Sequence, residues 1–207
     1  IRAFLIEQGI TVRTGAHALR SSLFAILENR KDEISPRMNG LIVDLYQDWI
    51  GLDERIGAIT GEIEMIGKSE ENCQRLMSVP GIGPIISTAM VAAIGTGDAF
   101  GRGRDFGAWL GLVPRQYSTG GKTVLGRISK RGSKYLRTLF IQAAHVILMR
   151  PKNWQKFSFG PWLTEAATRL HRNKLATALA NKLARIAWSV LANQQTFDTN
   201  KEEVTAI

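Results

Sequence analysis

The chain has 207 residues, of which 44% are apolar, and it carries a formal net charge of +9. This apolar fraction is that of a globular protein with a core, and the longest apolar runs, of about a dozen residues, are too short to span a bilayer. A single cysteine, Cys73, excludes an internal disulfide and any cysteine-rich zinc site, and it favours a reducing cytoplasm. Because the chain starts at Ile1 rather than Met, we expect further residues upstream.

The charges are segregated along the chain. Between Asp44 and Glu71 there are eight acids and two bases, whereas the residues from Phe106 to Thr164 include ten Lys or Arg and no Asp or Glu. A concentrated basic region is the expected footprint of nucleic-acid binding. A solvated basic face without a ligand is the alternative, but such a face usually contains interspersed acids. The sequence therefore predicts a nucleic acid as a partner.

The first third of the chain is predicted to be helical. Residues 1–35 are interpreted as a helical remnant of an upstream domain, with no chemistry of their own. From Pro36 onward an apolar repeat with alternating steps of three and four residues runs to Met77, and Glu70 is the one polar residue at its eleven positions. This spacing predicts a coiled coil over 36–77 that joins copies of the chain into a homo-oligomer. A long helix buried within one globular domain is the alternative.

Two helices joined by the turn Pro80-Gly81-Ile82-Gly83 are predicted next. The pattern is similar to a helix-hairpin-helix module, in which a Gly-x-Gly turn exposes backbone N–H groups to a phosphate. Gly81 and Gly83 are the predicted contacts, and such contacts are independent of nucleotide sequence. The alternative is an ordinary tight turn between packed helices.

The densest cluster of positive charge, with seven Lys or Arg, lies between Trp109 and Arg137. Gly120-Gly121 indicates a tight turn, and the residues on either side of it favour a short β-hairpin. Ser133 is placed to cap a following helix, and basic residues in the first turn of that helix oppose its dipole unless an anion is bound nearby. The predicted phosphate contacts are Arg115, Lys122, Arg127, Lys130, Arg131, Lys134 and Arg137.

Ser118, beside this turn, is either a turn residue or a nucleophile. A serine hydroxyl needs a base or strong electrostatic help, and no His, Asp or Glu lies within a dozen residues of it. The neighbouring cations would stabilise a pentacoordinate phosphate, whereas deprotonation would need metal-bound groups of another domain. Tyr117 is the rival nucleophile, but it lacks the His and Arg companions of tyrosine recombinases.

The remaining residues predict further helices and a tail. Residues 151–162 form an aromatic-rich connection, for which hydrophobic anchoring of the last helices is a better explanation than stacking on bases. Residues 78–192 form one predicted domain, and residues 193–207 a flexible tail. The predicted fold class is therefore mainly α: a long coiled-coil helix followed by a compact helical domain with a helix-hairpin-helix and one short β-hairpin.

Three segments between about residues 76 and 192 form a recognisable combination: VPGIGPIISTAMVAAIG, FGAWLGLVPRQYSTGGKTVLGRISKRGSKYLRTLFIQAA and ALANKLARIAW. Together they resemble the C-terminal transposase domain of the IS-one-ten insertion-sequence family. The phrases GLVPRQYSTGGK and LGRISKRG are more similar to its IS-eleven-eleven subgroup. The coiled coil and the N-terminal helices lie upstream in the order that the family has.

The resemblance implies a subunit of a DNA transposase, or recombinase, whose upstream RuvC-like nuclease domain binds Mg²⁺ through four acidic residues. None of the acids in this chain matches the motifs of that domain, so no metal ligand or cofactor is assigned here, and the chain alone is expected to be inactive. By motif position, Ser118 is the serine that the family supplies to a composite active site, where it forms a transient 5′-phosphoserine-type linkage.

The resemblance further implies an oligomer guided by a structured RNA, associated with the nucleoid in the bacterial cytoplasm. A non-catalytic helix-hairpin-helix module that binds DNA or RNA is the alternative function.

Overall fold

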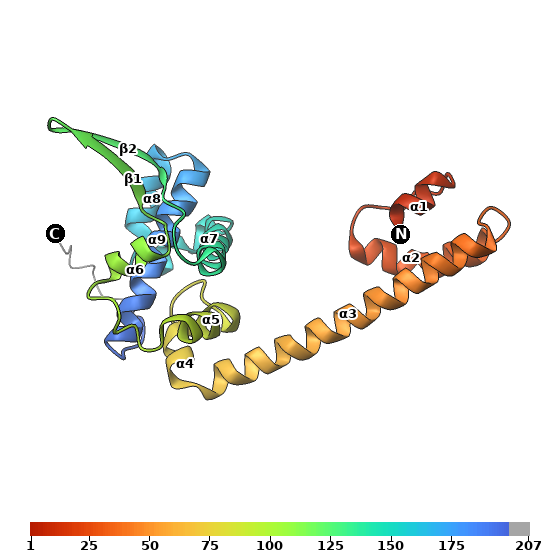
Figure 1. The fold of residues 1–207 in the computed structure, drawn as a ribbon, viewed down its shortest axis with the longest axis horizontal. Helices are drawn as coiled ribbons and strands as arrows, with labels where there is room; N and C mark the ends of the chain where they lie inside the picture. Colours follow the sequence, from red (N-terminus) through yellow and green to blue (C-terminus); the bar gives the residue numbers. More distant parts are fainter. Residues whose placement is uncertain (199–207) are drawn as a thin grey trace. The chain divides into compact units, whose positions relative to one another are not determined.

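The computed structural model describes residues 1–198, and the chain divides into two compact units, Ile1–Gly61 and Glu62–Ile207 (Figure 1). The described residues are mainly α-helical with one two-stranded antiparallel sheet, which confirms the predicted fold class. Each unit has a hydrophobic core of its own. No helix in this part of the chain is long and apolar enough to cross a membrane.

The N-terminal unit is built from three helices, which are α1 (Arg2–Glu7), α2 (Ala16–Asn29) and α3 (Pro36–Ser69) as far as Gly61. Helix α2 buries three leucines that recur every four residues and so share one face, Leu19, Leu23 and Leu27. Ile42 and Tyr46 of α3 complete this core. Pro36 begins α3 at a position where no backbone donor is lost, and the Ser35 hydroxyl accepts the N–H of Met38 at 3.3 Å.

Beyond this core, the apolar repeat of α3 is exposed. Leu52, Ile56 and Ile59 are 55%, 61% and 54% exposed. Helix α3 ends at Ser69 rather than continuing to Met77, so the single helix predicted over 36–77 is interrupted. The reason is Glu70, whose extended backbone leaves the helix and whose carboxylate accepts the Cys73 N–H at 2.8 Å, which caps α4 (Glu71–Met77).

The C-terminal unit is organised around α9 (Arg172–Ala192). Four helices pack against it, and these are α4, α6 (Gly103–Trp109), α7 (Lys134–Leu148) and α8 (Gly160–Arg169). The buried face of α9 contains four alanines that permit close approach of other helices, Ala176, Ala180, Ala184 and Ala187. Gly107 of α6 lies so near that a Cβ atom there would be 2.4 Å from Oδ1 of Asn181. Helix α5 (Pro84–Ile94) packs against α4 and α7.

The aromatic connection anchors the last helices to this core, as predicted. The 3₁₀ helix η1 (Pro151–Lys156) places the indole N–H of Trp154 at 3.0 Å from the carbonyl oxygen of Ile147, and Phe159 is fully buried. The predicted flexible tail begins differently, because Phe197 packs against the core and donates its N–H to the Ser78 hydroxyl at 2.7 Å. Residues 199–207 of that tail lie outside the described residues.

Candidate nucleic-acid interface

A β-hairpin carries the predicted nucleophile. Strand β1 (Pro114–Thr119) pairs antiparallel with β2 (Lys122–Ile128), so that Thr119 lies opposite Lys122 and Ser118 opposite Thr123. The two turn glycines, Gly120 and Gly121, have φ angles of 58° and 78°. Two consecutive left-handed residues form the turn that fits the twist of a two-residue hairpin, and glycine adopts this conformation without strain. The hairpin predicted from the sequence is therefore present, and it projects from the helices of its unit (Figure 1).

Ser118 lies one residue from this turn, on an exposed strand. Gln116, two residues earlier and hence on the same face of the strand, donates its side-chain amide to the Ser118 oxygen at 2.7 Å. Within residues 1–198, Gln116 is the sole side chain hydrogen-bonded to Ser118. An amide can orient a hydroxyl group, but it is not a base, so this contact does not activate the serine. The sequence analysis missed Gln116, although strand alternation would have placed it beside Ser118.

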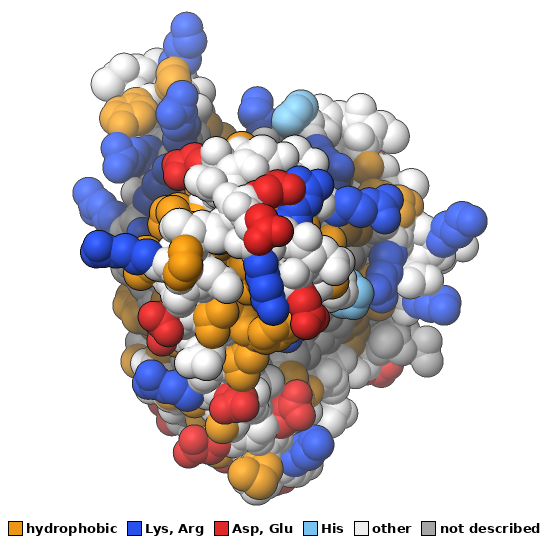
Figure 2. All heavy atoms as spheres, turned by 90° about the vertical axis from the view of Figure 1, so that its right-hand side faces the viewer, with side chains coloured by type: hydrophobic (Ala, Val, Ile, Leu, Met, Phe, Trp, Pro, Cys, Tyr) orange, Lys and Arg blue, Asp and Glu red, His pale blue; other side chains and the backbone are white. Residues whose placement is uncertain are grey.

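The hairpin combines positive charge with exposed apolar side chains. Tyr117, Val124 and Leu125 are 61%, 47% and 61% exposed. Tyr117 pairs with Val124 on the face opposite Ser118, so the two rival nucleophiles point in opposite directions. In the space-filling view of Figure 2, the hairpin protrudes at the upper left, where blue basic and orange apolar side chains stand together.

The base of the hairpin is formed by a close crossing of the two chain segments that enter and leave it. Gly111 and Gly132 have φ angles of 72° and 70°. A Cβ atom on Gly111 would be 2.3 Å from the carbonyl oxygen of Arg131, and one on Gly132 would be 1.7 Å from that of Trp109. No other residue fits at either position, because both the backbone conformation and the available space require glycine.

Arg137 ties this crossing together from inside the domain. Its guanidinium donates to the carbonyl oxygens of Leu110 at 2.8 Å and Arg131 at 3.0 Å, which lie before β1 and after β2. The side chain is only 8% exposed. Arg137 was predicted to contact a phosphate, but the structure directs its charge inward to backbone carbonyls. The same contacts explain why a cation is found in the first turns of α7, where it opposes the helix dipole.

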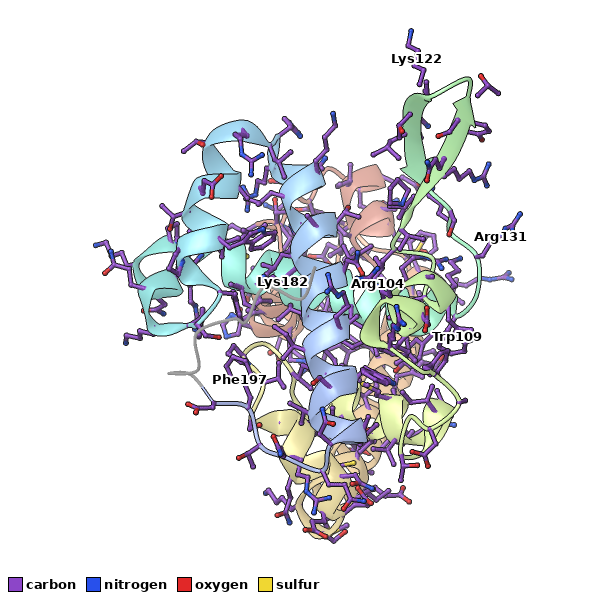
Figure 3. The ribbon with its side chains drawn as sticks, turned by 90° about the vertical axis from the view of Figure 1, so that its left-hand side faces the viewer. Arg104, Trp109, Lys122, Arg131, Lys182 and Phe197 are labelled. Carbon is purple, nitrogen blue, oxygen red and sulfur yellow. The ribbon has the colours of Figure 1, made fainter. Side chains whose placement is uncertain are left out.

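The other six predicted cations lie at the surface on or next to the hairpin, and these are Arg115, Lys122, Arg127, Lys130, Arg131 and Lys134. Within residues 1–198 none of the six forms an ion pair. Arg115 donates to the carbonyl oxygen of Ser129 at 3.3 Å, across the ends of the two strands. Figure 3 shows Lys122 at the hairpin tip and Arg131 near its base, both pointing away from the domain. The structure thus places six exposed cations without acid partners on the hairpin that carries Ser118 and on the segment that follows it.

The glycine turn between α4 and α5 lies elsewhere on the same unit. Gly81 has a φ angle of 83°, and a Cβ atom there would be 3.0 Å from Cδ1 of Ile147, near the end of α7. Lys134 begins that helix, and thirteen residues of α-helix separate these positions by about 20 Å. Packing against α7 is therefore one reason for glycine at 81. The structure does not bring Gly81 and Gly83 together with the hairpin.

Residues 1–198 contain no group of three or more His, Cys, Asp or Glu side chains that could hold a metal ion. The single cysteine, Cys73, is buried. Burial, together with the hydrogen bond and negative charge of Glu70, raises the pKa of Cys73 to about 11. This thiol is therefore neutral and unreactive near pH 7.

Residues 73–158, which include the glycine turn, the hairpin and α7, match the family described as "Transposase IS116/IS110/IS902 family". The chain is 39% identical over 198 residues to the transposase for insertion sequence element IS1111A of Coxiella burnetii, covering 95% of this chain and 54% of that protein. It is 41% identical over 197 residues to the transposase for element IS1328 of Yersinia enterocolitica, covering 95% of this chain and 58% of that protein.

The chain is thus similar to members of that transposase family over residues 73–158. The IS-one-ten resemblance found in the motifs is therefore confirmed, since IS110 is one of the elements that name the family. A probable family 20 transposase of Pseudomonas aeruginosa is 38% identical over 195 residues, covering 94% of this chain and 57% of that protein. The chain spans a little over half the length of these three curated relatives.

Proposed function

We propose that this chain is the DNA-binding, serine-bearing part of a transposase that recombines DNA through Ser118. The observation that carries the proposal is the exposed hairpin, which presents Ser118 on a unit whose hairpin and following segment carry six exposed cations without acid partners. The similarity of residues 73–158 to the transposase family supports it. DNA phosphates are the expected ligands, because Lys and Arg side chains without acid partners are attracted most strongly to a polyanion.

In the proposed reaction, Ser118 Oγ attacks a DNA phosphorus atom, a new oxygen–phosphorus bond forms, and the bond to the departing DNA oxygen breaks. The residues of this chain would bind and orient the phosphate. Exposed cations of the hairpin would stabilise the added negative charge of the pentacoordinate state, and the Gln116 amide would orient the serine hydroxyl. The serine proton must pass to a base outside the hairpin, because Gln116 cannot accept it.

A magnesium-dependent nuclease domain is expected to complete the site. The described residues do not fit a metal site of their own, since residues 1–198 hold no cluster of three potential ligands. No step of the proposed reaction is therefore assigned to a metal bound by this chain. The composite site requires another domain or subunit, and we expect this chain alone to be inactive.

Assembly through α3 is the second part of the proposal. Leu52, Ile56 and Ile59 continue the spacing of a coiled-coil seam and are more than half exposed. Pairing of this helix with a second copy would bury the stripe and form a homo-oligomer. The exposed cations would also suit a structured guide RNA, because RNA and DNA offer the same phosphodiester charge.

The decisive test restores an upstream nuclease domain from a relative and supplies DNA carrying the transposon ends. Ser118→Ala should abolish strand exchange and any covalent protein–DNA adduct, while Tyr117→Phe on the opposite face should retain both. An adduct that persists in Ser118→Ala and is lost in Tyr117→Phe would refute the serine assignment. Gln116→Glu keeps the size of the orienting side chain, and it should slow the reaction by adding negative charge beside the phosphate.

A non-catalytic DNA- or RNA-binding module is the alternative function, and the absence of a base beside Ser118 within residues 1–198 favours it. Both functions predict DNA binding by the hairpin. They differ in the restored protein, where the alternative predicts that Ser118→Ala leaves recombination unchanged.

A further inference from the structure

A second surface on the C-terminal unit has the properties of a ligand site. It is an open groove of about 440 Å³ between the end of α7, η1, and the adjoining ends of α8 and α9. Its lining includes the apolar side chains of Leu148, Pro151, Trp154, Leu170 and Leu175, and polar atoms contribute to its surface as well. We refer to it as the α8–η1 groove. Its volume falls within the range of about 300–1,000 Å³ that is common for ligand pockets.

The α8–η1 groove is separate from the hairpin. In Figure 3 the cyan and light-blue elements η1 and α8 lie on one side of α9, while α6 and the green hairpin lie on the other. None of the residues that line the groove belongs to the hairpin or to its base. A ligand in this groove would therefore leave the hairpin free.

Basic residues lie in the groove and next to its lining residues in the sequence. Arg172 lines the groove itself, and the exposed side chains Arg150, Lys152 and Arg169 directly adjoin lining residues in the sequence. Glu165 is the one acid between residues 150 and 192. It pairs with Arg169 at 3.3 Å, but both side chains are mostly exposed, so this pair is weak and easily exchanged.

The floor of the groove is rigid, whereas its lip is adaptable. The indole N–H of Trp154 is fixed by the carbonyl oxygen of Ile147 at 3.0 Å, and Leu148 and Leu175 are buried. Met149 lines the same groove and is 69% exposed. A methionine side chain is flexible and polarizable, so it can close over flat groups of different shape. Apolar lining residues beside Arg172 suit a ligand that combines an apolar flat group with negative charge.

We propose that the α8–η1 groove binds unpaired nucleotides of a nucleic-acid strand, with a base on the apolar floor and the flanking phosphates at the rim. The inference rests on the proposed nucleic-acid function and extends it to a second site. A duplex cannot use this floor, because its bases are stacked on one another, whereas an unpaired base exposes its flat face. An acidic peptide would satisfy Arg172, but the indole of Trp154 in the lining favours a nucleobase. The chain would thus hold a duplex at the hairpin and an unpaired strand in the groove.

The test compares short oligonucleotides by fluorescence anisotropy with the full chain. Oligothymidylate should bind about tenfold more tightly than an abasic strand of equal length, because one stacked base contributes roughly this factor. Met149→Glu should remove the advantage of the base-bearing strand. The control is Met65→Glu on α3, where the methionine is similarly exposed, at 67%, but lies outside the groove. Arg172→Gln should lower the salt slope for the single strand by about 0.7.

A hairpin variant separates this inference from the proposed function. Arg115→Ala, Lys122→Ala and Arg127→Ala combined should weaken duplex binding and leave the preference for the base-bearing strand intact. A preference for oligothymidylate over its abasic counterpart supports the groove and identifies DNA as the ligand. The same preference with oligouridylate identifies RNA as the ligand. The proposal is overturned if base-bearing and abasic strands bind with equal affinity, or if the two methionine variants have equal effects. It is also overturned if an acidic amphipathic peptide binds in place of either strand.

Discussion

Arg137 distinguishes a structural role from a DNA-binding role at the same position. Its guanidinium bonds two carbonyl oxygens, one on each side of the hairpin, and is 8% exposed. Hydrogen bonds that involve a charged group contribute about 1.5–3 kcal/mol each, so two contribute about 3–6 kcal/mol. Arg137→Met also relieves the desolvation of a buried charge, which offsets part of this loss. We therefore expect the free energy of unfolding to fall by about 2–4 kcal/mol.

Thermal unfolding followed by circular dichroism measures this effect. For a chain of this size, a loss of about 2–4 kcal/mol lowers Tm by roughly 4–16 °C. Arg137→Lys should recover only part of the loss, because an ammonium group cannot form the planar fork that reaches both carbonyls. Lys134→Met is the matched control, since Lys134 begins the same helix but is exposed. Its Tm should stay within about 1–2 °C of the wild type, in keeping with the small effect of most surface substitutions.

If Arg137 contacts a phosphate instead, Arg137→Met should change the salt dependence of DNA binding rather than Tm. In that case Arg137→Met would lower the slope of log affinity against log salt by about 0.9 and leave Tm unchanged. That pair of results would refute the buried-clamp role. The structure predicts that Lys134→Met, not Arg137→Met, shows the change in slope at constant Tm.

Three further predictions concern the fold and the assembly. Gly132→Ala should destabilise the hairpin base strongly, since its Cβ would be 1.7 Å from a carbonyl oxygen, whereas Gly120→Ala at the open turn should lower Tm less; equal effects would contradict the crossing. Because the pKa of Cys73 is raised to about 11, its labelling by a thiol reagent in the folded protein should accelerate about tenfold per pH unit from pH 8 to 10. The thiol of the unfolded chain ionises first, near its ordinary pKa of 9.0, so Cys73 lowers the free energy of unfolding as the pH rises from 9.0 to about 11. Fast labelling of the folded protein at pH 8 would instead show that Cys73 is open to solvent. Ile59→Asp should lower the oligomeric mass measured by light scattering, while Ala58→Asp, one residue off the stripe, should not, and an unchanged mass in both would exclude the seam.

The local features of the site could be predicted from the sequence because neighbouring residues determine them. Gly120-Gly121 predicted the turn, and Ser133 predicted the start of α7, whose cap it forms by accepting the Leu136 N–H at 3.3 Å. Glu70 was the polar exception in an apolar repeat, and the structure shows why: it begins a new helix rather than occupying a seam position. A helix cap of this kind has a sequence signature, so the break after Ser69 was within reach of sequence reasoning.

The remaining features depend on contacts between distant parts of the chain. Nothing near Arg137 in the sequence indicates that the carbonyl oxygen of Leu110, 27 residues earlier, would lie beneath it. The requirement for glycine at 132 likewise arises from the backbone of Trp109. Phe197 was assigned to a polar tail, yet it packs against the core and its N–H bonds Ser78, 119 residues away. Charge patterning located the basic region correctly, but it could not separate exposed cations from a buried one.

The shape of the hairpin determines how Ser118 can be positioned. Isolated two-stranded hairpins are at best marginally stable in water, so the hairpin relies on the crossing at Gly111 and Gly132 and on the Arg137 clamp. Ser118 lies four residues beyond the start of β1, which corresponds to about 14 Å. A tilt of about 10° at the base would therefore move its hydroxyl by about 2 Å, whereas a catalytic group must be held within about 0.5 Å. The clamp can direct the hairpin, but it cannot fix Ser118 for chemistry. In the proposed reaction, the domain that completes the composite site has this role, and loss of that domain should reduce the rate of reaction more than it reduces the binding of DNA.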